Sequence, residues 1–159
     1  MLKKETLLNA EQLRVLFKYD PESGIFSWLC GKNTGEIAGS LNCDGYVRIS
    51  VLGFSYTAHR LAWLYMTGKW PKTMDHKNRV RTDNRWINLR ECTVTQNLGN
   101  RSPQSNNKLG IKGVVFNEKT GKYKATIRRD HLGYFDTAEA AQEAYWKAAQ
   151  EIYGEFANA

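Results

Sequence analysis

Residues 74–101 read MDHKNRVRTDNRWINLRECTVTQNLGNR, and this stretch decides the fold that we expect for the chain. The pair Asp75-His76 closes a first strand-like run and is followed by a polar, basic loop. A second short run ends at Asn88-Leu89. The segment Thr93-Val94-Thr95-Gln96 then fits a capping box, which predicts a short helix with Asn97 one turn in. The stretch therefore predicts the order strand, loop, strand, helix, with polar residues at the corners.

Positive charge is concentrated around this stretch. Residues 56–105 carry nine Lys or Arg against three Asp or Glu, and residues 108–129 carry seven against one, whereas residues 130–159 carry one against six. Clustered positive charge suits a polyanion such as DNA, because each phosphate that is neutralised releases a condensed counterion. The alternative, a charge that serves only solubility, would need no clustering.

The composition indicates a globular protein, with 42% hydrophobic and 25% charged residues. The three cysteines, Cys30, Cys43 and Cys92, include no C-x-x-C pair, and an odd number argues against a disulfide framework, so a reducing compartment is expected. No run approaches the length of a membrane span, and the first ten residues lack the apolar core of a signal peptide. We therefore expect a cytoplasmic protein without a membrane partner.

The residues before this stretch predict two helices and two hairpins. Asn9 is a candidate N-cap for a helix over residues 7–17, and Gln12 three residues on completes a capping box. Turn chemistry in YDPESG, residues 19–24, predicts a hairpin, and residues 45–58 alternate and turn at Leu52-Gly53, which predicts a second hairpin with one buried face. Residues 59–70, HRLAWLYMTGKW, predict a helix that ends at Gly68. His59 at its start either contacts phosphate or is a capping or buried histidine, and periodicity leaves both roles open.

The ordered set Asp75, His76, Asn88, Thr93 and Asn97, preceded by HRLAW, resembles the HNH nucleases, which share the ββα-metal fold. The Asp-Pro-Glu-Ser-Gly turn and the string GYVRI are similar to the leader ahead of many phage-type HNH endonucleases, and the aromatic residues of this leader are expected in the core. The resemblance implies a homing-endonuclease-like enzyme that hydrolyses phosphodiester bonds in double-stranded DNA.

Carried over residue by residue, the resemblance makes His76 the general base and makes Asp75 and Asn97 the metal ligands. This hard oxygen-ligand set suits Mg²⁺ and tolerates Mn²⁺. Some HNH proteins hold a structural zinc through paired C-x-x-C motifs, and no zinc is expected here. Neighbouring residues on a regular strand face opposite ways, so Asp75 and His76 share a site only if the strand bends or ends there.

The resemblance also gives the middle asparagine of the pattern a supporting role in catalysis, bracing the loop and orienting the base. Asn88 is the best match for this position, and Asn84 is the alternative. The basic residues of the loop, Arg79, Arg81 and Arg85, are expected to bind DNA.

The polar segment at residues 102–110 predicts a linker, after which the pattern changes to three short strands and a helix. In the middle strand, basic and polar positions alternate with Tyr123, Ala125 and Ile127, so that one face is basic and the other apolar. The helix starts at Asp136 or Thr137 and carries an apolar stripe that is expected to cover the apolar face. The stripe consists of Ala140, Ala141, Ala144, Tyr145, Ala148, Ala149 and Ile152. The basic face consists of Lys122, Lys124, Thr126 and Arg128.

This C-terminal region resembles the AP2 DNA-binding domain, through Lys112-Gly113-Val114, Gly121-Lys122-Tyr123, Leu132-Gly133-Tyr134-Phe135 and Ala148-Ala149. The resemblance implies a three-stranded antiparallel sheet backed by a helix, with an exposed face that binds DNA. Val115 and Thr120 stand where plant AP2 domains carry arginine and tryptophan, so we expect contacts to phosphates rather than plant-type sequence preference. The alternative is a small structural sheet. The expected DNA-binding residues are Lys112, Lys122, Lys124, Arg128 and Arg129.

The sequence thus predicts an α+β chain in four parts: a β-rich leader at 1–55, an HNH nuclease core at 56–101, a linker at 102–110 and an AP2-like domain at 111–159. A monomer is favoured. The competing function is that of a non-catalytic DNA-binding protein or transcriptional regulator with a degenerate HNH core.

Overall fold

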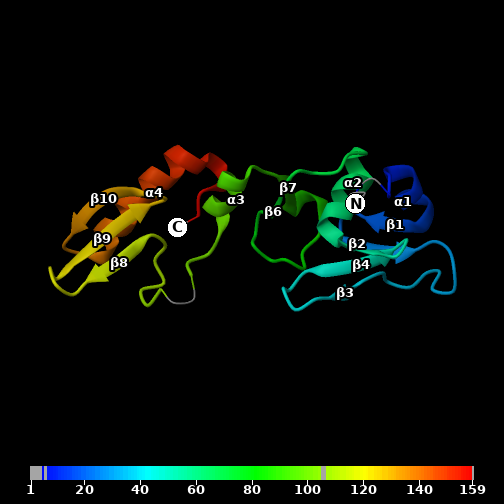
Figure 1. Cartoon of the computed structure of the whole chain (residues 1–159), viewed down its shortest axis with the longest axis horizontal. Helices are drawn as coiled ribbons and strands as arrows, with labels where there is room; N and C mark the ends of the chain where they lie inside the picture. Colours follow the sequence, from blue (N-terminus) through cyan, green and yellow to red (C-terminus); the bar gives the residue numbers. More distant parts are fainter. Residues whose placement is uncertain (1–4, 6, 105–106, 159) are drawn as a thin grey trace. The chain divides into compact units, whose positions relative to one another are not determined.

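The computed structural model of the chain describes residue 5 and residues 7–104 and 107–158, which form a mixed α+β structure (Figure 1). Two compact units are present, residues 1–92 and residues 93–159, which we call the N-terminal unit and the C-terminal unit. Ser105 and Asn106 of the predicted linker lie outside the described residues. No helix in the described part of the chain has the length and apolar character needed to cross a bilayer.

The N-terminal unit begins with α1 (Ala10–Leu16), which starts at the predicted capping box of Asn9 and Gln12. The predicted first hairpin is formed by β1 (Phe17–Asp20) and β2 (Ile25–Trp28). The predicted second hairpin is formed by β4 (Val47–Val51) and β5 (Phe54–Thr57), and β3 (Ser40–Leu41) adds a third strand in the order β3-β4-β5. Helix α2 (Ala58–Thr67) follows and ends at Gly68, whose backbone is left-handed as expected.

One hydrophobic core joins the leader to the residues that follow it. Its buried members come mainly from α1, both hairpins and α2, and one comes from the second strand after α2. They include Leu13, Phe17, Phe26, Ile49, Tyr56, Leu61, Leu64 and Leu89. The leader is therefore packed into the same unit as residues 56–92, and the four-part division at residues 55, 101 and 110 stays a prediction.

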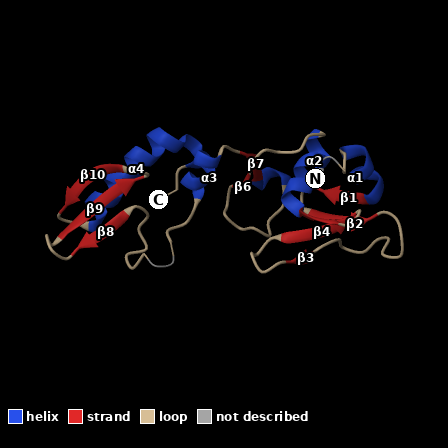
Figure 2. Ribbon diagram, viewed as in Figure 1, coloured by secondary structure: helices blue, strands red, loops and turns tan. Residues whose placement is uncertain are grey.

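The N-terminal unit closes with an antiparallel pair, β6 (Met74–His76) and β7 (Leu89–Glu91), in which Asp75 lies opposite Arg90. The basic loop of residues 77–85 connects the two strands through a short 3-10 helix, η2 (Trp86–Asn88). Figure 2 shows this pair as short strands joined by a long loop. The predicted order of strand, loop and strand is confirmed, but the predicted end of the second strand at Asn88-Leu89 is wrong. The strand begins at Leu89, because residues 86–88 form the 3-10 helix.

The C-terminal unit starts with α3 (Val94–Asn100), which has the predicted capping box of Thr93 and Gln96. Three strands, β8 (Val114–Asn117), β9 (Lys122–Ile127) and β10 (Asp130–Phe135), form an antiparallel sheet in the order β10-β9-β8. Helix α4 (Ala138–Tyr153) covers one face, where Ala125 and Ile127 are buried, and η3 (Gly154–Phe156) follows it (Figure 1).

Two details of the C-terminal prediction are wrong. Arg128 does not lie on the strand face but in a two-residue turn with Arg129, because Ile127 pairs with Asp130 and the tight turn requires the positive φ of 55° that Arg128 adopts. The buried stripe of α4 is centred on Ala141, Tyr145, Ala149 and Tyr153. Ala140, expected in the stripe, is exposed.

Candidate active site

His76 is the last residue of β6, and its side chain is buried. Its Nε2 lies 3.3 Å from Oδ1 of Asn84, a buried residue of the basic loop. An amide oxygen can only accept a hydrogen bond, so this contact selects the tautomer in which Nε2 carries the hydrogen. In that tautomer the lone pair of the ring is on Nδ1.

The surroundings of His76 favour the neutral imidazole. Burial lowers the pKa of His76 below its ordinary value, and the hydrogen bond to Asn84 and the carboxylate of Asp75 oppose this shift without outweighing it. A histidine with a lowered pKa is uncharged near neutral pH and is able to accept a proton.

The two asparagines that compete for the middle position of the pattern have different contacts. Asn88 accepts a hydrogen bond from the backbone N–H of Asn78 at 2.9 Å and donates one to the backbone carbonyl of Asp83 at 2.7 Å. It therefore ties together both ends of the basic loop. The contact to His76 comes from Asn84 instead.

The first hairpin of the leader holds the backbone that carries Asn84. The hydroxyl of Tyr19 donates to the Asn84 carbonyl at 2.7 Å, and the N–H of Trp86 donates to the carbonyl of Pro21 at 2.9 Å. Gly24 has a φ of +75°, and a Cβ at this position would lie 2.4 Å from the carbonyl carbon of Asn84. A glycine is thus required both by the turn and by the close approach.

Asp75 is buried and forms an ion pair with its cross-strand partner Arg90, whose Nη2 and Nε lie 2.8 and 2.9 Å from Oδ2. This ion pair was not predicted, because the second strand was expected to end before position 90, whereas the pairing of β6 with β7 brings positions 75 and 90 opposite each other. Asp75 and His76 were expected to share a site only if their strand bends or ends there, and β6 does end at His76.

A second histidine lies against the first. The rings of His59 and His76 are edge to face, with 5.0 Å between their centroids, and Tyr46 packs on His59 at 5.2 Å and on His76 at 6.1 Å. Nε2 of His59 is 3.3 Å from Oγ1 of Thr57, and its buried Nδ1 has no hydrogen-bond partner among the described residues. Desolvation, with a smaller contribution from His76, lowers the pKa of His59 to about 3.

Tyr46 departs from the expectation for the aromatic residues of the leader. Phe17, Tyr19 and Phe26 are buried in the core as predicted, whereas Tyr46 is half-buried beside the two histidines. Nothing local in the sequence indicates this role, because the contacts join positions that are 13 and 30 residues apart in the chain.

The basic loop presents three arginines in different states. The guanidinium of Arg81 lies 5.0 Å from the centroid of the Tyr46 ring and donates to the backbone carbonyl of Asp44. Arg85 is exposed and forms a two-pronged ion pair with Asp83, and the hydrogen bonds of Arg85 lower the pKa of Asp83 to about 2. Arg79 is exposed with a positive φ of 64°. Arg79 and Arg81 therefore remain better candidates for DNA contacts than Arg85, whose charge is compensated.

Asn97, the second expected metal ligand, lies in the C-terminal unit. It is half-buried in α3, and its backbone N–H bonds to the carbonyl of Thr93. Helix α3 packs on α4 so closely that a Cβ at Gly99 would lie 2.6 Å from the ring of Tyr153. Asp75 and Asn97 thus belong to different compact units.

The basic residues predicted for DNA binding in the C-terminal unit also differ in their contacts. The ammonium group of Lys112 donates to the carbonyls of Leu98 and Gly99 at the end of α3. Lys122 pairs with Asp136 at 3.1 Å. Lys124 lies in a cross-strand row between Val115 and Tyr134. Arg128 and Arg129 are exposed in the turn.

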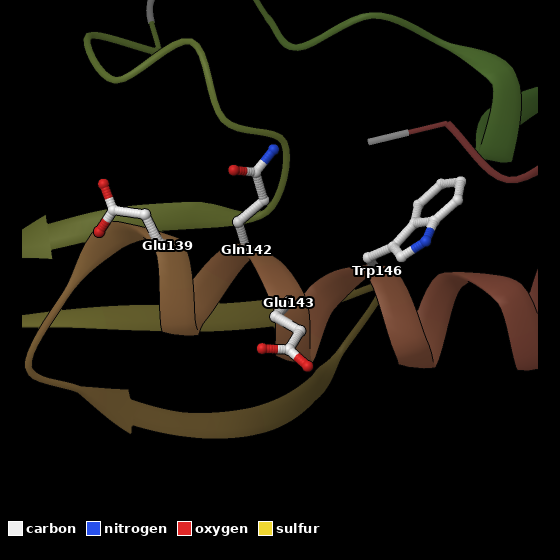
Figure 3. Close-up of a pocket in the computed structure, with 4 residues that line it drawn as sticks. All are labelled: Glu139, Gln142, Glu143 and Trp146. Atoms are coloured by element: carbon white, nitrogen blue, oxygen red, sulfur yellow. The ribbon is translucent and has the colours of Figure 1, made fainter.

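Neither of two other features marks a site. A shallow, open pocket in the C-terminal unit lies along α4 and is lined by Glu139, Gln142, Glu143 and Trp146, all from this helix (Figure 3). Among the described residues, no three His, Cys, Asp or Glu side chains gather into a metal-binding group.

Known proteins match the part of the chain that contains these residues. Residues 56–98 match the family model of the HNH endonucleases. We call these residues the HNH segment. It contains His59, Asp75, His76, Asn84 and Asn97, and it makes the chain similar to a family of nucleases.

An uncharacterised HNH endonuclease of Acanthamoeba polyphaga mimivirus is 29% identical to this chain over 138 residues, which is 83% of the chain. The chain spans 65% of the length of this relative. A solved structure that describes DNA binding and cleavage by the HNH homing endonuclease I-HmuI is also similar. The alignment covers 52% of this chain and 49% of the I-HmuI chain, with 22% identity and a TM-score of 0.42.

Proposed function

We propose that the chain is a metal-dependent DNA endonuclease in which the HNH segment carries the chemistry and His76 is the general base. One observation carries this proposal: within a segment that matches HNH endonucleases, His76 is buried and its Nε2 contacts Asn84. A neutral, oriented imidazole is what proton abstraction from water requires near neutral pH.

The proposed reaction is hydrolysis of one phosphodiester. Nδ1 of His76 takes a proton from water while the water oxygen bonds to phosphorus. The bond from phosphorus to the 3′ oxygen breaks, and the departing oxygen takes up a proton from solvent water. The products are a 5′ phosphate and a 3′ hydroxyl. Asn84 holds the base in its tautomer, and Asn88 and the leader hairpin hold the loop that carries Asn84. Both asparagines are positioning residues in this account.

Asp75 and Asn97 are the proposed ligands of a divalent ion, Mg²⁺ or Mn²⁺. A carboxylate and an amide oxygen fit a hard cation that keeps most of its water ligands. When bound, the ion supplies positive charge to the phosphate and to the departing 3′ oxygen. Arg90 holds the carboxylate of Asp75 through Oδ2 and so fixes its orientation.

Double-stranded DNA is the proposed substrate, with Arg79 and Arg81 as phosphate contacts beside His76. Support comes from the net excess of positive charge in residues 56–105. We further propose that the C-terminal unit, similar to AP2 domains in its motifs, binds DNA through the sheet face opposite α4. Lys124 between the exposed side chains of Val115 and Tyr134 supports this choice. Lys122, Arg128 and Arg129 flank that face, whereas Lys112 has a structural role at the end of α3.

One observation favours the competing function, a DNA-binding protein with a degenerate HNH core. The carboxylate of Asp75 is already compensated by Arg90, so metal binding must compete with an ion pair. Such a protein would bind DNA in the presence of Mg²⁺ or Mn²⁺ and leave it uncut.

The test is the variant His76→Ala, compared with His131→Ala. His131 is exposed on the C-terminal sheet, where it pairs with Thr126 of the proposed DNA-binding face, so its removal controls for loss of a histidine that is near DNA but is not the base. We expect His76→Ala to slow plasmid cleavage by about two to four orders of magnitude and to leave DNA affinity nearly unchanged. His131→Ala should retain the cleavage rate. Equal rates in the two variants, or a parallel loss of affinity in His76→Ala, would remove His76 from the catalytic role.

A further inference from the structure

The face of the β3-β4-β5 sheet that points away from the core carries a polar row whose chemistry the proposed function does not use. On β4, Ile49 and Val51 point into the core, so Arg48 points to the other face. Arg48 pairs with Ser40 on one side and Thr57 on the other. Side chains at paired positions lie on the same face of a sheet. The row Ser40-Arg48-Thr57 is therefore a continuous polar strip, which we call the Arg48 row.

The Arg48 row leads directly to the proposed base. Thr57 contacts Nε2 of His59 at 3.3 Å, and the ring of His59 packs on that of His76. Tyr46, two residues before Arg48 and on the same side of the strand, packs on both histidines. The neighbours of Arg48 on its sheet face, Thr57 and Tyr46, thus contact the histidine pair.

Arg48 itself has unused binding capacity. Its Nε is buried and has no hydrogen-bond partner among the described residues, and no described carboxylate forms an ion pair with it. The whole residue is only half-buried, so the side chain remains accessible. A buried N–H without a partner is costly in a folded protein, and the accessible part of the planar guanidinium can donate hydrogen bonds to a phosphate.

The backbone of Arg48 is held in place by the neighbouring strands. Gly39, with a φ of +104°, lets β3 approach β4 so closely that a Cβ there would lie 2.8 Å from the carbonyl oxygen of Arg48. The strand carrying Arg48 is thereby held between two neighbours. A second cation lies close to the Arg48 row, because the guanidinium of Arg81 lies over the ring of Tyr46.

We propose that Arg48 binds a DNA phosphate next to the phosphodiester that is cleaved at His76. In this proposal, Arg48 and Arg81 both lie near Tyr46, and their guanidinium groups bind phosphates beside His59 and His76. The leader in this account contributes to substrate binding as well as to the core. The inference rests on the proposed function, since it takes His76 as the base.

The experiment compares Arg48→Met and Arg48→Gln with Lys18→Met in the full chain. Lys18 is exposed on β1 of the same unit, so its replacement removes one positive charge at a different sheet. Affinity for a short DNA duplex is measured with Ca²⁺ at several salt concentrations, and cleavage of a supercoiled plasmid is measured with Mg²⁺. Circular dichroism shows which variants fold.

The proposal expects each neutral Arg48 variant to lower the steepness of log affinity against log salt by about 0.9, the value for one phosphate contact. Cleavage should slow by about tenfold or more, as for loss of a hydrogen bond to a charged group. Arg48→Lys should restore the salt slope and only part of the rate, because an ammonium group lacks the planar fork. Lys18→Met should change neither quantity.

Wild-type slope and rate in a folded Arg48 variant would overturn the proposal, and so would an equal loss in Lys18→Met. If one neutral variant does not fold, the other decides. A wild-type chain that binds the duplex but leaves plasmid intact refutes the proposed function, and the salt slope then still decides the role of Arg48. A wild-type chain that does not bind DNA refutes both.

Discussion

The two compact units of this chain differ in whether their candidate functional residues are buried or exposed. Of the six buried polar or charged residues among those described, five belong to the N-terminal unit: His59, Asp75, His76, Asn84 and Asn88. In the C-terminal unit, the basic residues expected to bind DNA lie on the sheet, in its turn or at a helix end, and three of them, Lys122, Arg128 and Arg129, are exposed.

This difference matches the proposed function, which assigns the chemistry to the N-terminal unit and part of DNA binding to the C-terminal unit. Buried polar groups are held in single orientations by hydrogen bonds, which a general base and its supports require. Exposed lysines and arginines keep their hydration and attract a polyanion without a fixed geometry. Substitutions in the N-terminal unit should therefore affect stability and rate strongly, and those on the C-terminal sheet should change salt dependence mildly.

The largest effect is expected at Gly24, where the first hairpin packs against the backbone of Asn84. Gly24→Ala places a methyl group 2.4 Å from the Asn84 backbone and strains a φ of +75°, which should lower the free energy of unfolding by about 2 to 5 kcal/mol. The matched control is Gly31→Ala, which has a similar φ of +83° and no atom within 4 Å of the added Cβ. Urea unfolding of both variants isolates the close approach, and equal losses would show that the hairpin does not press on Asn84.

A pH effect should follow from His59. Burial lowers its pKa to about 3, so between pH 7 and pH 5 the unfolded chain takes up a proton that the folded unit does not. Stability contributed by neutral His59 is therefore present above its ordinary pKa and falls as the pH drops, by about 2 kcal/mol at pH 5. Unfolding followed at both pH values should show this loss, and His59→Asn should show less of it. A pH dependence equal to wild type in His59→Asn would contradict the account.

The proposed metal ligands predict a change in ion requirement. Asn97→Ala and Asp75→Asn should each raise the Mg²⁺ concentration for half-maximal cleavage by about tenfold or more. Arg90→Gln removes the group that orients the Asp75 carboxylate, so it should also raise that concentration, by less than loss of a ligand does. Magnesium titrations of plasmid cleavage measure all three. Indifference to both ligand substitutions would refute the ligand pair.

The smallest effect is expected on the C-terminal sheet. Lys124→Gln should lower the salt slope of DNA binding by up to about 0.9. Lys147→Gln, on α4 and paired with Glu143, should leave the slope unchanged. Lys122→Gln should have an intermediate effect because Lys122 pairs with Asp136. An unchanged slope in Lys124→Gln would show that this sheet face does not contact DNA.

Local signals in the sequence predicted most elements of the fold. The capping boxes at Asn9 and Thr93, the stop at Gly68 and the turn at Leu52-Gly53 each depend on residues within about four positions of one another, and the structure confirms all four. Arg128 was expected on the strand and lies in the turn, because hairpin register depends on pairing with the next strand rather than on the turn residues alone.

The surroundings of the candidate base were much less predictable. Asn84, Asn88 and His76 are close in the chain and were identified, though the contact that orients His76 belongs to Asn84. The contributions of Tyr46, Gly24 and the Arg48 row come from residues far from His76 in sequence. They depend on how the leader packs on the HNH segment, and no spacing in a single sequence encodes that packing.

The most direct test of the central claim is the incubation of the wild-type chain with supercoiled plasmid over a range of Mg²⁺ and Mn²⁺ concentrations, with the DNA ends analysed. The account predicts metal-dependent cutting that leaves 5′ phosphates and 3′ hydroxyls. A chain that binds the plasmid and leaves it intact with both metals would contradict it.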